Sequence, residues 1–168
     1  TEHVVPGDPE IPLRVHRPKP ADGVLPCVYS MHGGGYVIGT YSAMLDDRQI
    51  TLSSRRDGLP VWSRESNAFG WRSYLGGRYG RDDVPYTAAP ARATDLSGLP
   101  PAFVSVGALD GFRDEDIDYA ARLNDAGVPT ELHVYPGACH GYQIAQDAAV
   151  TRQSRRDAEQ WLSRQLSR

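Results

Sequence analysis

The chain has 168 residues, 40% of them hydrophobic and 23% charged, which is ordinary for one globular domain. Its 18 basic and 21 acidic residues give a formal charge of −3, so nucleic acid and anionic membranes are not expected partners. No apolar run approaches the ~20 residues of a membrane span, and the two cysteines are too few for a disulfide framework.

The N-terminal half is predicted to contain two strands and one helix. Apolar residues at every second position of residues 11–15 predict a half-buried strand, and Pro12 places it near a sheet edge because proline cannot donate a ladder hydrogen bond. Residues 24–31 are mostly apolar and end at a glycine run, which predicts a buried central strand. Residues 66–75 predict a helix that ends at two glycines, within a polar and turn-rich stretch.

The C-terminal half alternates strands with helices. Short apolar runs predict strands over residues 102–106 and 130–135. Residues 113–126 predict a helix, because acidic residues crowd its first turn and Gly127 stands just past its end. Amphipathic spacing predicts a last helix over residues 149–166. The order of these elements indicates an α/β fold.

The most informative motif is His32 followed by Gly33, Gly34 and Gly35. Consecutive glycines after a strand allow backbone N–H groups to approach a substrate oxygen, because no Cβ atom stands in the way. Such N–H groups form an oxyanion hole, and this motif is typical of esterases with the α/β-hydrolase fold. That fold should then supply a G-x-S-x-G nucleophile, an acid and a histidine in this order. The chain has candidates for the last two and no G-x-S-x-G.

Two later motifs extend this pattern. Residues 110–115 read D-G-F-R-D-E and residues 140–142 read H-G-Y. With the glycine motif, they resemble the hormone-sensitive-lipase family of carboxylesterases (bacterial family IV), whose patterns are D-x-L-x-D-E and H-G-F. Phe112 and Tyr142 are mild departures from these patterns. The resemblance implies a mostly parallel α/β-hydrolase sheet and hydrolysis of small carboxylic esters, without a metal or an organic cofactor.

The resemblance also indicates what the sequence lacks. Members of the family carry a helix, a strand, a second helix and the nucleophile elbow between two stretches that here abut at residues 42–44. We therefore expect one partial α/β-hydrolase domain over residues 1–168, with an apparent internal deletion and without the N-terminal cap. In members of the family, the region that corresponds to residues 45–95 helps to cover the active site. We expect the aromatic residues of the helix at 66–75 to pack this cover.

The resemblance assigns a role to each candidate site residue. His140 would be the general base, and Asp110 would orient it and stabilise its imidazolium. Outside these motifs, Asp110 would be interpreted as a helix-capping residue and His140 as a solvated loop residue, but the motifs favour the catalytic roles. Gly33 and Gly34 would supply the oxyanion N–H groups, and His32 and Gly35 would support that loop.

No residue in the sequence is a convincing nucleophile. The Cys139 thiol adjoins His140, but neighbouring residues of an extended loop point apart and a small buried cysteine is the common case. Ser73 and Ser105 lack the context of a nucleophile elbow. Asp114 and Glu115 are expected to be acids of a helix's first turn rather than catalytic groups.

Two hypotheses remain open. In the first, the parent protein is a serine carboxylesterase whose nucleophile segment is missing from the sequence. In the second, the deletion is real and the chain is a non-catalytic remnant with a binding or assembly role. A sheet that lacks its central strands leaves backbone groups unpaired, so such a chain would have to repack, pair its strands with a second copy as a homo-oligomer, or remain partly unfolded. No secretory signal is visible, so we expect a cytoplasmic protein.

Overall fold

The computed structural model describes residues 1–6, 10–17, 23, 25, 47–48 and 51–167. The glycine motif at residues 32–35 and the apparent deletion at residues 42–44 lie outside the described residues. So does the predicted strand at 24–31, apart from Leu25. No helix in the described part of the chain is both long and apolar enough to cross a membrane.

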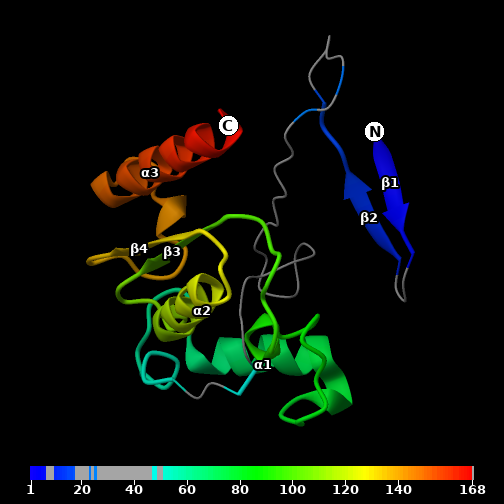
Figure 1. The fold of residues 1–168 in the computed structure, drawn as a ribbon. Coiled ribbons are helices and arrows are strands. Elements are labelled where there is room, and N and C mark those ends of the chain that lie inside the picture. The colour runs from blue at the N-terminus through cyan, green and yellow to red at the C-terminus, as the bar shows by residue number, and fades with distance from the viewer. Residues whose placement is uncertain (7–9, 18–22, 24, 26–46, 49–50, 168) are drawn as a thin grey trace.

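Strands β1 (Glu2–Val5) and β2 (Ile11–Arg14) form an antiparallel ribbon, seen in blue in Figure 1. Thr1 and Val15 exchange two backbone hydrogen bonds of 2.8 Å. Because hydrogen-bonded and non-hydrogen-bonded pairs alternate along such a ladder, Pro12 stands opposite Val4 at a non-hydrogen-bonded position. Its nitrogen therefore faces away from β1, as expected for a proline at a sheet edge. Strand β2 was predicted from the sequence, and β1 was not.

A parallel βαβ unit carries most of the packing between described elements. Strands β3 (Ala102–Gly107) and β4 (Thr130–Tyr135) pair in parallel, with Ala102 opposite Thr130. Helix α2 (Arg113–Asp125) connects them and packs on both strands. Helix α3 (Ala149–Leu166) lies on the opposite face of this sheet (Figure 1). The predicted strands and helices of the C-terminal half are confirmed to within one residue.

Helix α2 ends where the sequence predicts, for a reason that the backbone makes clear. Gly127 adopts φ +79° and its N–H donates to the Asn124 carbonyl, while the Val128 N–H donates to the Leu123 carbonyl. These two bonds define a Schellman motif, which requires a residue in the left-handed region at this position. Leu123 and Val128 are both buried in one apolar cluster, as that motif favours.

Helix α1 (Arg64–Leu75) begins two residues before the predicted helix, because the Ser63 hydroxyl accepts a hydrogen bond from the Ser66 N–H. Trp71 is 1% exposed and packs with Phe112 in an apolar cluster. Phe69 and Tyr74 are 63% and 51% exposed, so the prediction that they pack a cover is wrong for these two side chains.

Three short 3-10 helices complete the described elements: Gly76–Arg78, Pro90–Arg92 and Tyr142–Ile144.

Candidate active site

The loops that follow β3 and β4 are joined by backbone hydrogen bonds. The Ala108 N–H donates to the Tyr135 carbonyl, and the Leu109 N–H donates to the Ala138 carbonyl, both at 2.9 Å. The first bond continues the parallel ladder one residue beyond β3, and the second joins the two turns that follow the strands. In open α/β sheets this edge, at the carboxyl ends of the strands, is where ligands bind. The structure therefore fixes the two loops that carry Asp110 and His140 against each other.

Asp110 and His140 meet at this edge. The Asp110 Oδ2 atom lies 3.1 Å from the His140 Nδ1 atom. The Asp110 Oδ1 atom accepts the Phe112 N–H at 3.0 Å, so both carboxylate oxygens have a partner. Asp110 does not cap α2, whose N-cap is Phe112. The Asp110 side chain is 9% exposed and the His140 ring 34%, so the imidazole is the accessible member of the pair.

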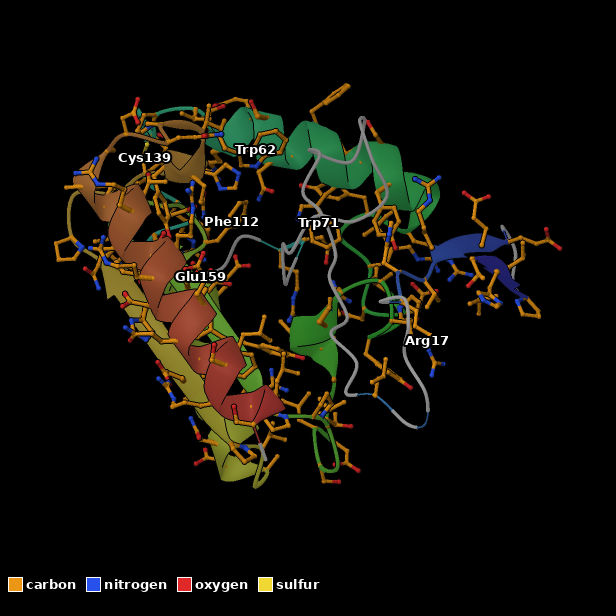
Figure 2. The ribbon with its side chains drawn as sticks, turned by 90° about the horizontal axis from the view of Figure 1, so that it is seen from above. Arg17, Trp62, Trp71, Phe112, Cys139 and Glu159 are labelled. Carbon is orange, nitrogen blue, oxygen red and sulfur yellow. The ribbon has the colours of Figure 1, made fainter. Side chains whose placement is uncertain are left out.

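Two aromatic rings flank the His140 imidazole. Phe112 packs edge-on with its ring centre 5.3 Å away, and Trp62 lies tilted at 5.9 Å. Figure 2 shows Trp62 and Phe112 in the same part of the molecule as Cys139, the neighbour of His140. Phe112 is 5% exposed and packs in the same apolar cluster as Trp71, so the loop that carries Asp110 is anchored in the apolar core. These contacts restrict the rotation of the imidazole.

Trp62 follows an unusual turn. Val61 adopts φ +68°, and the Trp62 N–H donates to the Pro60 carbonyl at 2.8 Å. Positive φ in a β-branched residue is strained and costs on the order of 1–3 kcal/mol. A turn closed between residues two apart is a γ-turn, and the form with positive φ at its central residue is the rare one. The backbone strain therefore lies directly beside the ring that packs on His140.

Carboxyl groups crowd the start of α2. Burial, together with the nearby carboxylates of Asp110 and Glu115, raises the pKa of Asp116 well above its ordinary value. Burial disfavours the charged form of Asp114, yet hydrogen bonds from Arg113 and Ser53 hold the pKa of Asp114 below its ordinary value. Asp114 and Glu115 lie in the first turn of the helix, where the sequence analysis expects them.

The other residues considered as nucleophiles show no link to the His140 ring. Cys139 is half-buried, and within the described residues its thiol makes no hydrogen bond with His140. The Ser73 hydroxyl donates to the Phe69 carbonyl inside α1, and Ser105 lies within β3. No group of three His, Cys, Asp or Glu side chains in the described part of the chain is placed to hold a metal ion.

A small hollow lies beside the site, lined in part by Leu59, Trp62, Asn67 and Phe112. A larger, open hollow lies on the polar face of α3, between Arg156 and Arg164, and shares no lining residue with the first. Only the first hollow is bounded by rings that contact His140.

Gly107 permits the close approach of the two loops. A Cβ atom on Gly107 would lie 2.4 Å from the Ala138 carbonyl oxygen, a backbone atom that cannot swing away. We expect Gly107→Ala to reduce the free energy of unfolding by about 1–3 kcal/mol, the usual effect of overpacking. Urea unfolding measures this loss. Gly77→Ala is the control because nothing lies within 4 Å of its Cβ position; equal stability of both variants would contradict the prediction.

Sequence reasoning missed three contributors to this site. Nothing in the sequence around Trp62 indicates that its ring packs on His140. Gly107 could have been suspected, because a glycine at the end of a strand often marks a close approach of backbone. Ser53, which is hydrogen-bonded to Gly111 and Asp114, lies 57 positions before Asp110, and nothing in the sequence indicates this contact.

The comparisons with known proteins bear on the fold and the family of the chain. The pattern of a family described as the alpha/beta hydrolase fold matches residues 41–144, more than half of the chain. The chain belongs to that family, and the predicted α/β-hydrolase fold is confirmed.

Three relatives illustrate the match. Esterase LipI of Mycobacterium tuberculosis (strain ATCC 25618 / H37Rv) is 33% identical over 102 residues, which are 61% of this chain and 32% of LipI. The structure named Bacterial Heroin Esterase aligns with a TM-score of 0.70 and 44% identity, over 73% of this chain and 40% of that chain. An esterase from the bacterial hormone-sensitive lipase (HSL) family gives a TM-score of 0.64 at 26% identity, over 73% of this chain and 41% of that chain. The resemblance to hormone-sensitive-lipase esterases is thus confirmed, and the chain spans less than half the length of these relatives.

Proposed function

We propose that the complete protein containing these residues hydrolyses small carboxylic esters, with His140 as the general base and Asp110 as its orienting acid. The observation that carries this proposal is the 3.1 Å contact between Asp110 Oδ2 and His140 Nδ1, at the carboxyl ends of two adjacent parallel strands. The relatives named as esterases support the same reaction class.

The Asp110 carboxylate selects the imidazole tautomer. It accepts a hydrogen bond from the His140 Nδ1–H group, so the Nε2 atom carries the lone pair and takes the proton of the attacking hydroxyl. The same proton then passes to the leaving alkoxide, which departs as an alcohol. Water repeats the cycle on the acyl-enzyme and releases the carboxylic acid. Asp110 stabilises the imidazolium in both half-reactions.

The remaining parts of the machinery are proposed from the sequence. Gly33 and Gly34 would donate their N–H groups to the oxyanion, on a loop supported by His32 and Gly35. The serine would come from a segment outside these 168 residues, which contain no G-x-S-x-G.

The surroundings of His140 favour esters with apolar groups. Trp62, which comes from residues 45–95, covers one side of the imidazole. The side-chain tips of Val61 and Ile144 both lie within 4 Å of the Cβ position of Gly141, next to His140. These two side chains are 68% and 82% exposed, so apolar surface lies open beside the base. We propose that residues 45–95 form part of the cover of this site.

Hydrolysis of 4-nitrophenyl butyrate by the complete protein tests the proposal. We expect turnover that falls about 10³-fold in His140→Ala, because general-base catalysis contributes about 10²–10⁴-fold. His133→Ala is the matched control, since His133 is a half-buried histidine of β4 that is bonded to Glu131. Its turnover should stay within about twofold of wild type. A folded wild-type protein without turnover, or equal turnover in both variants, would overturn the assignment.

A second candidate function follows from the fact that these residues contain no G-x-S-x-G. If the nucleophile segment is absent from the protein itself, the chain is a non-catalytic remnant with a binding or assembly role. A folded oligomer that hydrolyses no ester would favour this second function, whereas a monomer with measurable turnover would exclude it.

A further inference from the structure

Ser53 is fully buried and bonded to the start of α2. Its side chain is 0% exposed, and its Oγ atom donates to the Gly111 carbonyl at 2.9 Å. The same oxygen accepts the Asp114 N–H at 3.0 Å, while the Ser53 N–H donates to Asp114 Oδ2 at 2.8 Å. Ser53 lies 61 positions before Asp114, so these three bonds join distant parts of the chain.

These bonds replace the cap that α2 lacks. The N-cap residue Phe112 offers no side-chain hydrogen bond, and the first N–H groups of a helix have no partner inside it. The Ser53 hydroxyl accepts one of them, the Asp114 N–H, and the Asp114 carboxylate accepts the Ser53 N–H. The arrangement is a capping box assembled from two separate segments.

The bond from Ser53 to Gly111 also reaches the catalytic acid. The Gly111 carbonyl and the Phe112 N–H belong to one planar peptide unit. One end of this unit accepts the Ser53 hydroxyl, and the other end donates to Asp110 Oδ1. Asp110 Oδ2 in turn contacts His140 Nδ1. A hydrogen bond to the carbonyl polarises the amide and strengthens its N–H as a donor.

We propose that Ser53 is a positioning residue for the Asp110–His140 pair, because its hydroxyl fixes and polarises the Gly111–Phe112 peptide that holds Asp110. The catalytic meaning of this inference rests on the proposed function, whereas its structural test does not. Without the hydroxyl, the peptide can rotate, the bond to Asp110 Oδ1 weakens, and the carboxylate is free to leave the imidazole.

The test reads the His140 ring directly by NMR on the isotopically labelled complete protein. In wild type we expect a downfield proton resonance from His140 Nδ1–H and slow hydrogen exchange of the Phe112 amide. In Ser53→Ala the resonance should move upfield or vanish, and the Phe112 amide should exchange at least tenfold faster. Amide exchange in the interior of α2 serves as the internal reference, because it should change far less.

The neighbouring Ser54 supplies the matched control. It is 4% exposed, and its hydroxyl bonds only with Thr51 among the described residues. Ser54→Ala should leave both NMR signals as in wild type. Ser53→Cys fills the same space with a weak donor and carries the test if Ser53→Ala does not fold. Unchanged His140 and Phe112 signals in a folded Ser53 variant would overturn the proposal.

Ester hydrolysis gives a second readout that separates the two proposals. In an active protein, Ser53→Ala should lower kcat about tenfold, the effect of one hydrogen bond, with KM unchanged. Ser54→Ala should stay within about twofold. If the wild-type protein is inactive, the NMR result still decides whether Ser53 positions the pair, so only the esterase assignment fails. An unchanged kcat in an active Ser53→Ala protein would contradict the positioning role.

Discussion

Replacing Asp110 with Asn is expected to lower kcat/KM for ester hydrolysis by about 10⁴-fold. The amide has nearly the shape of the carboxylate, and its oxygen must occupy the Oδ1 position because the Phe112 N–H donates there. The amide NH₂ group then faces His140 Nδ1 and donates to it. Nδ1 becomes an acceptor, the ring proton moves to Nε2, and the imidazole can no longer take a proton from the nucleophile.

Steady-state kinetics of Asp110→Asn, together with the ¹⁵N shifts of the His140 ring, check this prediction. Asp118→Asn is the control, because it makes the same chemical change at an exposed position of α2. We expect the control to match wild type within about twofold. A loss below about tenfold in Asp110→Asn, or an Nδ1 that keeps its proton, would show that Asp110 does not select the tautomer.

Replacing Asp47 with Ala is expected to reduce the free energy of unfolding by about 3–5 kcal/mol. Asp47 is bonded at both oxygens, with Arg92 Nη2 at 2.5 Å and the Gly80 N–H at 2.9 Å. The Asp47 side chain is 0% exposed and that of Arg92 is 8% exposed. Removal of the carboxylate takes the Asp47 partner away from a buried guanidinium charge and removes the acceptor of the Gly80 N–H.

Urea unfolding measures this effect, and Asp83→Ala is its matched control. Asp83 pairs with Arg81, but both side chains are well exposed, and such pairs contribute about 0–1 kcal/mol. We expect the midpoint of Asp47→Ala to fall far below that of Asp83→Ala. Similar midpoints would mean that the buried pair contributes no more than a surface one.

Local signals in the sequence were sufficient for the C-terminal half of the fold. Strand β4 (Thr130–Tyr135) and helix α3 (Ala149–Leu166) have the predicted bounds, because hydrophobic periodicity and turn residues agree there. The end of α2 follows from the conformation of Gly127. Strand β1 was missed because four exposed residues show no burial pattern. The exposure of Phe69 depends on tertiary packing, which periodicity does not report.

The contact between Asp110 and His140 was predictable from the sequence, but the residues that support it were not. Asp110 and His140 lie 30 positions apart, and the motif order predicted their meeting through the βαβ unit. The bonds from Ser53, the ring of Trp62 and the close approach at Gly107 come from contacts between distant segments. No local pattern encodes such contacts, because each depends on where the whole chain places two backbones.

The most direct test of the central claim is covalent labelling of the complete protein with an alkyl fluorophosphonate, followed by peptide mapping. Such a reagent phosphonylates a serine whose hydroxyl a neighbouring base activates. We expect one labelled serine, outside the 168 residues of this sequence, and loss of labelling in His140→Ala but not in His133→Ala. A folded wild-type protein that takes no label, or a label that persists in His140→Ala, would contradict the role of His140 and Asp110 in ester hydrolysis.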